Sequence, residues 1–212
     1  MRISLALLVA LAPSFLLADD AKPLFDGKSL TGWMQRNGTA SYRIEGDCIV
    51  GKTSEGSPNS FLFTEKQYGD FELSFEVKVD NELNSGVQIR SASKPDKDNG
   101  RVHGPQVEIS TDGCAGFVYG EGLNTGWLTK EADGFKGKPE MSPFKAGEWN
   151  KYTVVAKGKS IKTSVNGKPV ADLVDETTGM MTGHIGLQVH GIPKGKGPYE
   201  VRWRNITLKE LK

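Results

Sequence analysis

The sequence predicts an all-β protein of the β-sandwich or jelly-roll class. Short runs of alternating apolar and polar residues recur along the chain, and turn-forming glycine and proline residues separate them. After the first 18 residues, no stretch of a dozen residues has the 3.6-residue apolar period of an amphipathic helix. About ten expected strands, without an internal repeat or a long linker, favour two packed antiparallel sheets in one domain.

The first 18 residues have the layout of a secretory signal peptide. Arg2 gives a positive start, an apolar run covers residues 3–17, and Ala18 is a small residue at the expected cleavage point. The run is shorter than the roughly 20 residues that span a membrane, and no second candidate span follows. We therefore expect an exported protein (periplasmic, cell-surface or secreted) in which residues 19–212 form a single domain.

Charge and cysteine content narrow the classes of function. The formal net charge of the chain is +1 and becomes zero without Arg2, so nucleic acid and anionic membranes are not expected partners. Cys48 and Cys114 either form one disulfide or remain two buried thiols, and both alternatives are open. Their spacing excludes a CxxC redox motif.

The clearest strand covers residues 71–79, which read Phe-Glu-Leu-Ser-Phe-Glu-Val-Lys-Val. Period two indicates a strand with one buried face and one solvated face. Further strands are expected at 42–52, 61–65, 85–91, 105–110, 116–119, 151–157, 160–165, 184–190 and 200–208. Gly158 and Asn166-Gly167 predict tight turns around 160–165. Residues 93–104 and 120–148 are expected to be long polar loops, which in a compact domain are often functional.

Three of these strands carry a glutamine and an ionisable residue two positions apart. The pairs are Gln88 with Arg90, Gln106 with Glu108, and Gln188 with His190. Alternation places each pair on one face, opposite apolar neighbours. If the strands are adjacent, their side chains form a patch that suits a polyhydroxylated ligand, because amides donate and accept while charged groups fix hydroxyls or a carbonyl. The alternative is an ordinary solvent-facing sheet surface, where these residue types are common.

Other side chains are candidates for ligand contact. Tyr119, Trp127 and Trp33 offer flat apolar surfaces for a sugar ring, and His103 lies before Gly104 in an expected loop. The paired-carboxylate strand of retaining sandwich-fold glycosidases, the nucleophile elbow and the phosphate-binding loops do not occur. The histidines lack zincin spacing, whereas a divalent cation held by carboxylates and carbonyls stays open.

Seven motifs in order give the chain a family resemblance. It resembles the 3-keto-disaccharide hydrolase family over residues 24 to 211, through Leu24-Phe-Asp-Gly-Lys-Ser-Leu-Thr-Gly-Trp33, Tyr68-Gly-Asp-Phe-Glu-Leu73, Asn84-Ser-Gly-Val-Gln-Ile-Arg90, Gly147-Glu-Trp-Asn150, Val165-Asn-Gly167, Gly186-Leu-Gln-Val-His190 and Trp203-Arg-Asn-Ile206. The resemblance implies a concanavalin A-like jelly roll, export, and action on glycosides oxidised at C3. Many relatives carry Glu-x-Gln where this chain has Gln106-Val-Glu108, which fits a subgroup with another substrate or one that only binds.

The implied substrate suggests a mechanism. A carbonyl at C3 acidifies the C2 proton, so a base can remove it and the enolate can expel the C1 oxygen before water adds. We assign Arg90 to the carbonyl or enolate oxygen, and Glu108 and His190 as base and acid in either order. A divalent cation is an alternative or additional enolate stabiliser. The amides that would orient hydroxyls are Gln88, Gln106 and Gln188.

Two other classes of function remain beside the enzyme. One is a non-catalytic carbohydrate-binding module, and the other is a structural or adhesion sandwich without a small ligand, since fold alone does not determine function. The sugar, its linkage and the oligomeric state are not defined by the sequence.

Overall fold

The computed structural model of the protein describes residues 20–94 and 100–212. The expected signal peptide, residues 1–18, lies outside this range. In the described range, no helix has the length and apolar character needed to cross a membrane.

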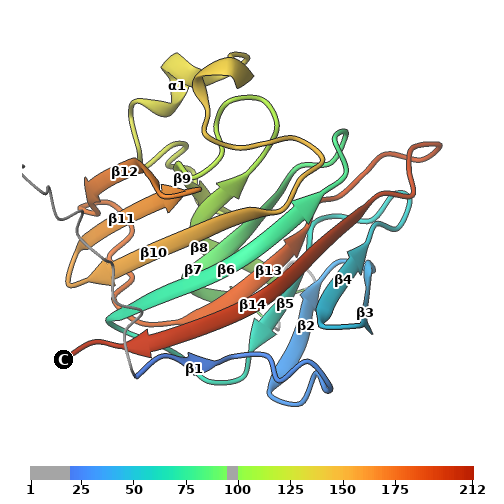
Figure 1. Cartoon of the computed structure of the whole chain (residues 1–212), viewed down its shortest axis with the longest axis horizontal. Coiled ribbons are helices and arrows are strands. Elements are labelled where there is room, and N and C mark those ends of the chain that lie inside the picture. Colours follow the sequence, from blue (N-terminus) through green and yellow to red (C-terminus); the bar gives the residue numbers. More distant parts are fainter. Residues whose placement is uncertain (1–19, 95–99) are drawn as a thin grey trace, which may run out of the picture.

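The structure is a jelly-roll sandwich of two antiparallel sheets, as the sequence predicts (Figure 1). The larger sheet has the order β12 (Lys168–Val174), β11 (Ser160–Val165), β10 (Asn150–Lys157), β6 (Phe71–Val79), β14 (Glu200–Glu210), β4 (Cys48–Lys52) and β3 (Ser41–Glu45), with β1 (Lys22–Pro23) paired to β14. The smaller sheet has the order β2 (Trp33–Asn37), β5 (Ser60–Thr64), β13 (His184–Val189), β7 (Ser85–Lys94), β8 (Arg101–Ile109) and β9 (Val118–Glu121).

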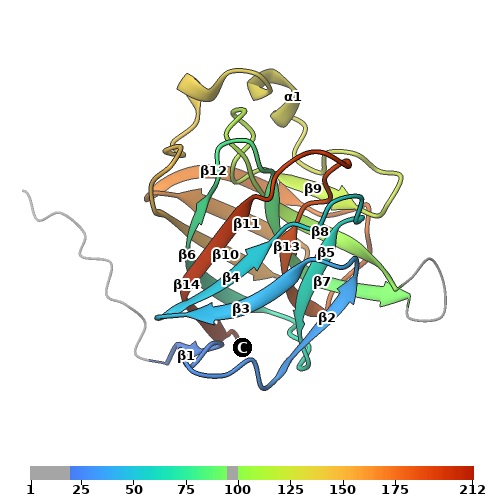
Figure 2. The same cartoon turned by 90° about the vertical axis from the view of Figure 1, so that its right-hand side faces the viewer.

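Little helix accompanies the sheets. The short helix α1 (Ala132–Phe135) and a 3₁₀ turn (Pro139–Met141) lie in the connection between β9 and β10. Two views at right angles place α1 at one end of the sandwich and β1 with the C-terminus at the other (Figures 1 and 2).

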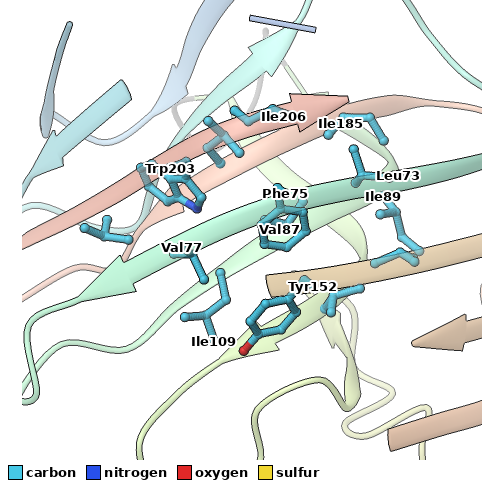
Figure 3. Close-up of a cluster of buried hydrophobic side chains, with 14 of the residues drawn as sticks. Leu73, Phe75, Val77, Val87, Ile89, Ile109, Tyr152, Ile185, Trp203 and Ile206 are labelled. Atoms are coloured by element: carbon cyan, nitrogen blue, oxygen red, sulfur yellow. The ribbon is translucent and has the colours of Figure 1, made fainter. Parts of the chain in front are cut away.

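The core lies between the two sheets and follows from strand alternation. In β6 every second residue from Phe71 to Val79 is buried, as its period-two pattern predicts. Figure 3 shows these side chains meeting residues from the facing sheet, such as Val87 and Ile89. The ring of Phe75 stacks on that of Tyr152 with centroids 5.0 Å apart.

Some strand boundaries differ from the expectation. The range 42–52 is two strands, because Gly46 takes a positive φ of 63° and turns the chain between β3 and β4. Residues 101–104, expected in a loop, belong to β8. Strands β2 and β12 were not expected. In β12 the burial pattern is irregular and Pro169 lies on an edge strand, so the alternation that marks a strand is weak there.

Both cysteines are buried free thiols in the structure. Burial raises the pKa of Cys48 to about 11 and that of Cys114 to about 12, so both thiols stay protonated at neutral pH. Of the two alternatives that the sequence left open, the structure has the free thiols.

Candidate functional site

Four polar side chains come together on the face of the smaller sheet that points away from the core. They form what we call the polar row, which consists of Gln88, Gln106, Glu108 and Gln188. Gln88 pairs with Gln106 across β7 and β8, and Gly86 lies opposite both Glu108 and Gln188. Their exposed fractions are 0% for Gln88 and Gln188, 2% for Gln106 and 7% for Glu108. The polar row is therefore a buried group, and not the solvated sheet surface that was the alternative.

Glycines make room for the polar row. A Cβ at Gly86 would lie 2.5 Å from Cδ of Gln106, so the Gln106 side chain can lie across β7 only because position 86 has no side chain. A Cβ at Gly186 would lie 2.4 Å from the Phe63 ring and 3.2 Å from Cβ of Gln88. Both glycines face the row on neighbouring strands, and their absent side chains leave the space that it fills.

Hydrogen bonds connect three members of the polar row, Gln88, Gln106 and Glu108, and end at Glu108. Nε2 of Gln88 donates to Oε1 of Gln106 at 3.0 Å, and Nε2 of Gln106 donates to Oε2 of Glu108 at 3.1 Å. Nδ2 of Asn84 donates to the other carboxyl oxygen, Oε1. Both oxygens of Glu108 thus accept an amide N–H, an arrangement that favours the carboxylate.

Burial raises the pKa of Glu108 from 4.5 to about 7. Desolvation is the largest cause, and the hydrogen bonds from Asn84 and Gln106 oppose it by stabilising the charged form. The negative charges of Asp112 and Glu121 raise it further. A carboxyl that titrates near neutral pH is suited to taking up and releasing a proton.

Gln188 differs from the other amides of the polar row. Neither its Nε2 nor its Oε1 has a hydrogen-bond partner among the described residues, although the side chain is fully buried. It belongs to the same strand face as Gly186, beside the apolar cluster of Phe61, Phe63 and Val102. An unpaired buried amide is costly, so Gln188 is the member of the polar row whose hydrogen-bonding capacity is unused.

Arg90 does not join the polar row, and this part of the prediction is wrong. Relative to β8, strand β7 has one extra residue between Gln88 and Ala92, and Arg90 takes a φ of +48° in this bulge. The strand parity therefore reverses. The guanidinium, 1% exposed, donates to the carbonyls of Gly69 at 2.8 Å and Gly158 at 2.6 Å.

Asp70 completes the surroundings of Arg90. Its Oδ1 accepts a hydrogen bond from Nη2 of Arg90 at 2.8 Å and another from the backbone N–H of Gly158 at 2.9 Å. Arg90 thus joins the smaller sheet to the β10–β11 turn of the larger sheet. Its guanidinium is held by Asp70 and by two backbone carbonyls, and Glu108 is not among its hydrogen-bond partners in the described residues.

His190 is half-buried at the end of β13, in a fixed orientation. Its Nδ1 lies 2.7 Å from the carbonyl oxygen of Gly191. A carbonyl only accepts, so Nδ1 carries a proton in this contact and Nε2 is the ring nitrogen left for a ligand. The backbone N–H of Gly191 donates to Oδ1 of Asn59 at 2.8 Å, which holds this segment against β5.

Sequence reasoning missed Glu121, a second carboxyl near the polar row, which is half-buried. Residue 121 pairs with Gly104 and residue 119 pairs with Gln106, so Tyr119 and Glu121 face the same side as Gln106. Desolvation raises the pKa of Glu121, whereas a hydrogen bond from Asn59 and the charges of Arg101 and His190 lower it. Glu121 lies two positions after Tyr119, so strand alternation predicts that the two side chains share a face, and this signal could have identified Glu121.

The aromatic candidates separate into two groups. Tyr119 and Trp127 are half-buried and form an edge-to-face pair with centroids 5.2 Å apart, beside Gln106 on β8. Trp33 is instead a core residue, 7% exposed, whose indole donates to the carbonyl of Leu24. The expectation that Trp33 offers a surface for a sugar ring is therefore wrong.

His103 lies apart from the polar row. It pairs with Ala92 beyond the bulge, and it alternates along β8 with Val102, which packs with Phe61. Its Nδ1 is buried and has no partner within the described part of the chain. Residues 20–94 and 100–212 contain no group of three or more His, Cys, Asp or Glu side chains placed to hold a metal ion.

Glu108 should dominate the pH dependence of stability between pH 4.5 and 7. A carboxyl whose pKa is higher in the folded protein contributes stability that is fully present below pH 4.5 and lost as the pH rises through 7. We expect the loss to reach about 3 kcal/mol. Urea unfolding from pH 4 to 8 should show it as a falling difference between wild type and Glu108→Gln. A difference that does not change with pH would contradict the raised pKa.

Comparisons with known proteins agree with this architecture. At 21% identity and a TM-score of 0.65, the structure is similar to a Parabacteroides distasonis protein provisionally assigned as a glycosyl hydrolase, with 92% of this chain and 95% of that one covered. A carbohydrate-binding module of Bacillus subtilis (19% identity, TM-score 0.57, 84% and 96% covered) and a Bacillus licheniformis β-glucanase (14%, 0.59, 91% and 97%) share the fold.

The family of the chain follows from its sequence. None of the curated proteins that were compared matches it significantly. The family model of the 3-keto-alpha-glucoside-1,2-lyase-like domain matches residues 20–209, which confirms the resemblance seen in the motifs. This chain belongs to that family.

Proposed function

We propose that this protein is an exported enzyme that cleaves 3-keto-glycosides by elimination and subsequent hydration. Membership of the 3-keto-alpha-glucoside-1,2-lyase-like family supports a carbohydrate ligand. The observation that carries the proposal is Glu108, a buried carboxyl with a pKa of about 7 that is held by two amide donors. Such a group can remove a proton at neutral pH, which elimination requires.

The proposed chemistry begins at C2 of the sugar. The Glu108 carboxylate takes the C2 proton, and the electron pair of that C–H bond forms the enolate of the C3 carbonyl. The enolate then expels the C1 oxygen, which receives a proton from the protonated form of His190. This expulsion re-forms the C3 ketone and leaves a double bond between C1 and C2. Water finally adds across that double bond, with its hydroxyl on C1 and a proton on C2, so that the net reaction is a hydrolysis.

Other residues would bind the sugar. Gln188 has the free amide donor of the polar row, and we propose that it stabilises the enolate oxygen in place of Arg90. Tyr119 and Trp127 offer half-buried aromatic surface to the sugar ring. A divalent cation brought in with the substrate is a further candidate for the stabilising role.

Turnover of a 3-keto-glucoside tests this proposal. The purified protein should release the aglycone from a 3-keto-glucoside and leave the unoxidised parent glucoside intact, because only the ketone acidifies the C2 proton. Parallel reactions with a chelator determine whether a cation is required. Binding of the 3-keto compound without release, measured by calorimetry, would instead identify a carbohydrate-binding module. Neither binding nor release would contradict both functions.

A further inference from the structure

The carboxyl of Glu108 is the last member of a longer chain of buried hydrogen bonds. Oγ of Ser91 lies 2.6 Å from Oε1 of Gln88, and the chain continues through Gln106 to Glu108. Ser91 and Gln88 are both fully buried. We infer that Ser91 and Gln88 are positioning residues, which act through Gln106 to hold Glu108 as a carboxylate ready to accept a proton.

The donor and acceptor groups fix the direction of this series of hydrogen bonds, in which each residue from Ser91 onward donates toward Glu108. An ionised carboxylate only accepts, so Gln106 must turn its amide N–H toward Glu108 and its carbonyl oxygen toward Gln88. The same requirement passes to Gln88, whose carbonyl oxygen then needs a donor. The hydroxyl of Ser91 is that donor. Its other acceptors, the carbonyls of Ile89 at 3.0 Å and Pro105 at 3.3 Å, are farther away.

The backbone is shaped to place Ser91 in this chain. The extra residue of β7 turns Arg90 away and brings Ser91 to the face that Gln88 occupies. Position 104 on β8 must be glycine, because a Cβ there would lie 2.4 Å from Oγ of Ser91. Strict alternation would have placed an arginine at this point of the face. The bulge supplies a hydroxyl donor instead.

Aligned hydrogen bonds of this kind stabilise negative charge at their accepting end. Each amide polarises the next, and burial of these side chains weakens dielectric screening of the effect. The chain therefore opposes the burial that raises the pKa of Glu108, together with the direct bond from Asn84. The charges that act in the other direction are those of Asp112, in the β8–β9 turn, and Glu121 on β9. Tyr152, from β10, contacts the Glu108 carbonyl and not its carboxyl.

Ser91→Ala tests the inference, because it removes only the hydroxyl that donates to Gln88. Its control is Ser85→Ala on the same strand. Ser85 is equally buried but donates to the backbone carbonyl of Gln188, which is not part of the series of hydrogen bonds that ends at Glu108. Without the hydroxyl, the Glu108 carboxylate should be harder to form. Ser91→Ala should therefore destabilise the protein more at pH 8.5 than at pH 5, whereas the effect of Ser85→Ala should not change with pH.

A second background isolates the contribution of Glu108. In Glu108→Gln the destabilisation caused by Ser91→Ala should lose its pH dependence, because no carboxylate remains at the end of the chain. Gln88→Leu should behave like Ser91→Ala with a larger effect, and Ser91→Ala alone suffices if Gln88→Leu does not fold. Equal, pH-independent losses for Ser91→Ala and Ser85→Ala would overturn the inference and reduce Ser91 to a packing role.

The effect of Ser91 on catalysis rests on the proposed function, and it is measured by activity and not by unfolding. The acid limb of the kcat/KM profile of Ser91→Ala should move to higher pH, and a shift of half a unit would lower activity at pH 6 about 3-fold. An unmoved profile in an active enzyme would count against the positioning role. If wild type does not turn over 3-keto-glucosides, the proposed function fails, while the unfolding measurements still test the chain of hydrogen bonds.

Discussion

Glu108→Gln should lower kcat/KM for a 3-keto-glucoside by about 10²-fold or more, because the variant has no group that can remove the C2 proton. The amide of glutamine has nearly the shape of the carboxyl, and its oxygen can still accept a hydrogen bond from Gln106 or Asn84. Substrate affinity should consequently change much less than turnover. Single-turnover rates and calorimetric binding with the same 3-keto-glucoside separate the two quantities.

The pH dependence of wild-type kcat/KM is a second test of Glu108 as the base. The pKa of Glu108 is about 7, and a base must be deprotonated to act, so activity should rise with pH through this value. Glu131→Gln is the matched control, since this carboxyl is exposed at the start of α1, in the connection between β9 and β10. His190→Ala should also lose about 10²-fold if His190 is the acid. Wild-type turnover in Glu108→Gln would remove Glu108 from the mechanism.

Asp70→Ala should destabilise the protein by about 3 kcal/mol. The carboxyl is the one charged partner of the buried Arg90 guanidinium, among the residues that the structure describes, and it also accepts a hydrogen bond from the N–H of Gly158. Its removal leaves a buried positive charge without its salt-bridge partner, although the charge of Asp175 still acts on it, and this costs more than the ion pair itself contributes. Because Asp70 is itself one-third exposed, we expect the lower end of the range for buried pairs.

Denaturant unfolding at pH 7 measures this effect. Asp172→Ala is the control, because Asp172 pairs with Lys162 at 2.9 Å in a bridge whose side chains are both mostly exposed. Such surface pairs contribute at most about 1 kcal/mol. If the two variants lose the same small amount of stability, Arg90 does not have the structural role that its contacts indicate.

Local periodicity was enough to find most of the candidate site. The polar row follows from alternation within β7, β8 and β13. The hydrogen-bonded register of these strands then places their polar side chains next to one another. Alternation is a property of consecutive residues, so the sequence alone predicts it. The same rule places Tyr119 and Glu121 on one face, although only Tyr119 was singled out.

The failures have a common physical origin in non-local structure. Arg90 left the predicted face because a non-glycine residue adopts a positive φ in a bulge, which neither its type nor its neighbours indicate. Trp33 resembles a ligand platform in sequence but packs in the core, since a large amphipathic ring suits either position. The burial of the polar row also depends on how strands distant in sequence pack around it.

The extra residue in β7 separates two tasks between neighbours in the chain. The side chain of Arg90 connects the two sheets, and the side chain of Ser91 donates a hydrogen bond to Gln88 on the opposite face of the strand. Replacements of Ser91 should therefore act mainly on the pKa of Glu108 in a protein that still folds. Replacements of Arg90 should instead lower the stability of the fold and leave the pKa of Glu108 unchanged. Deleting one residue of the bulge would restore strict alternation and reverse the faces of the residues that follow it.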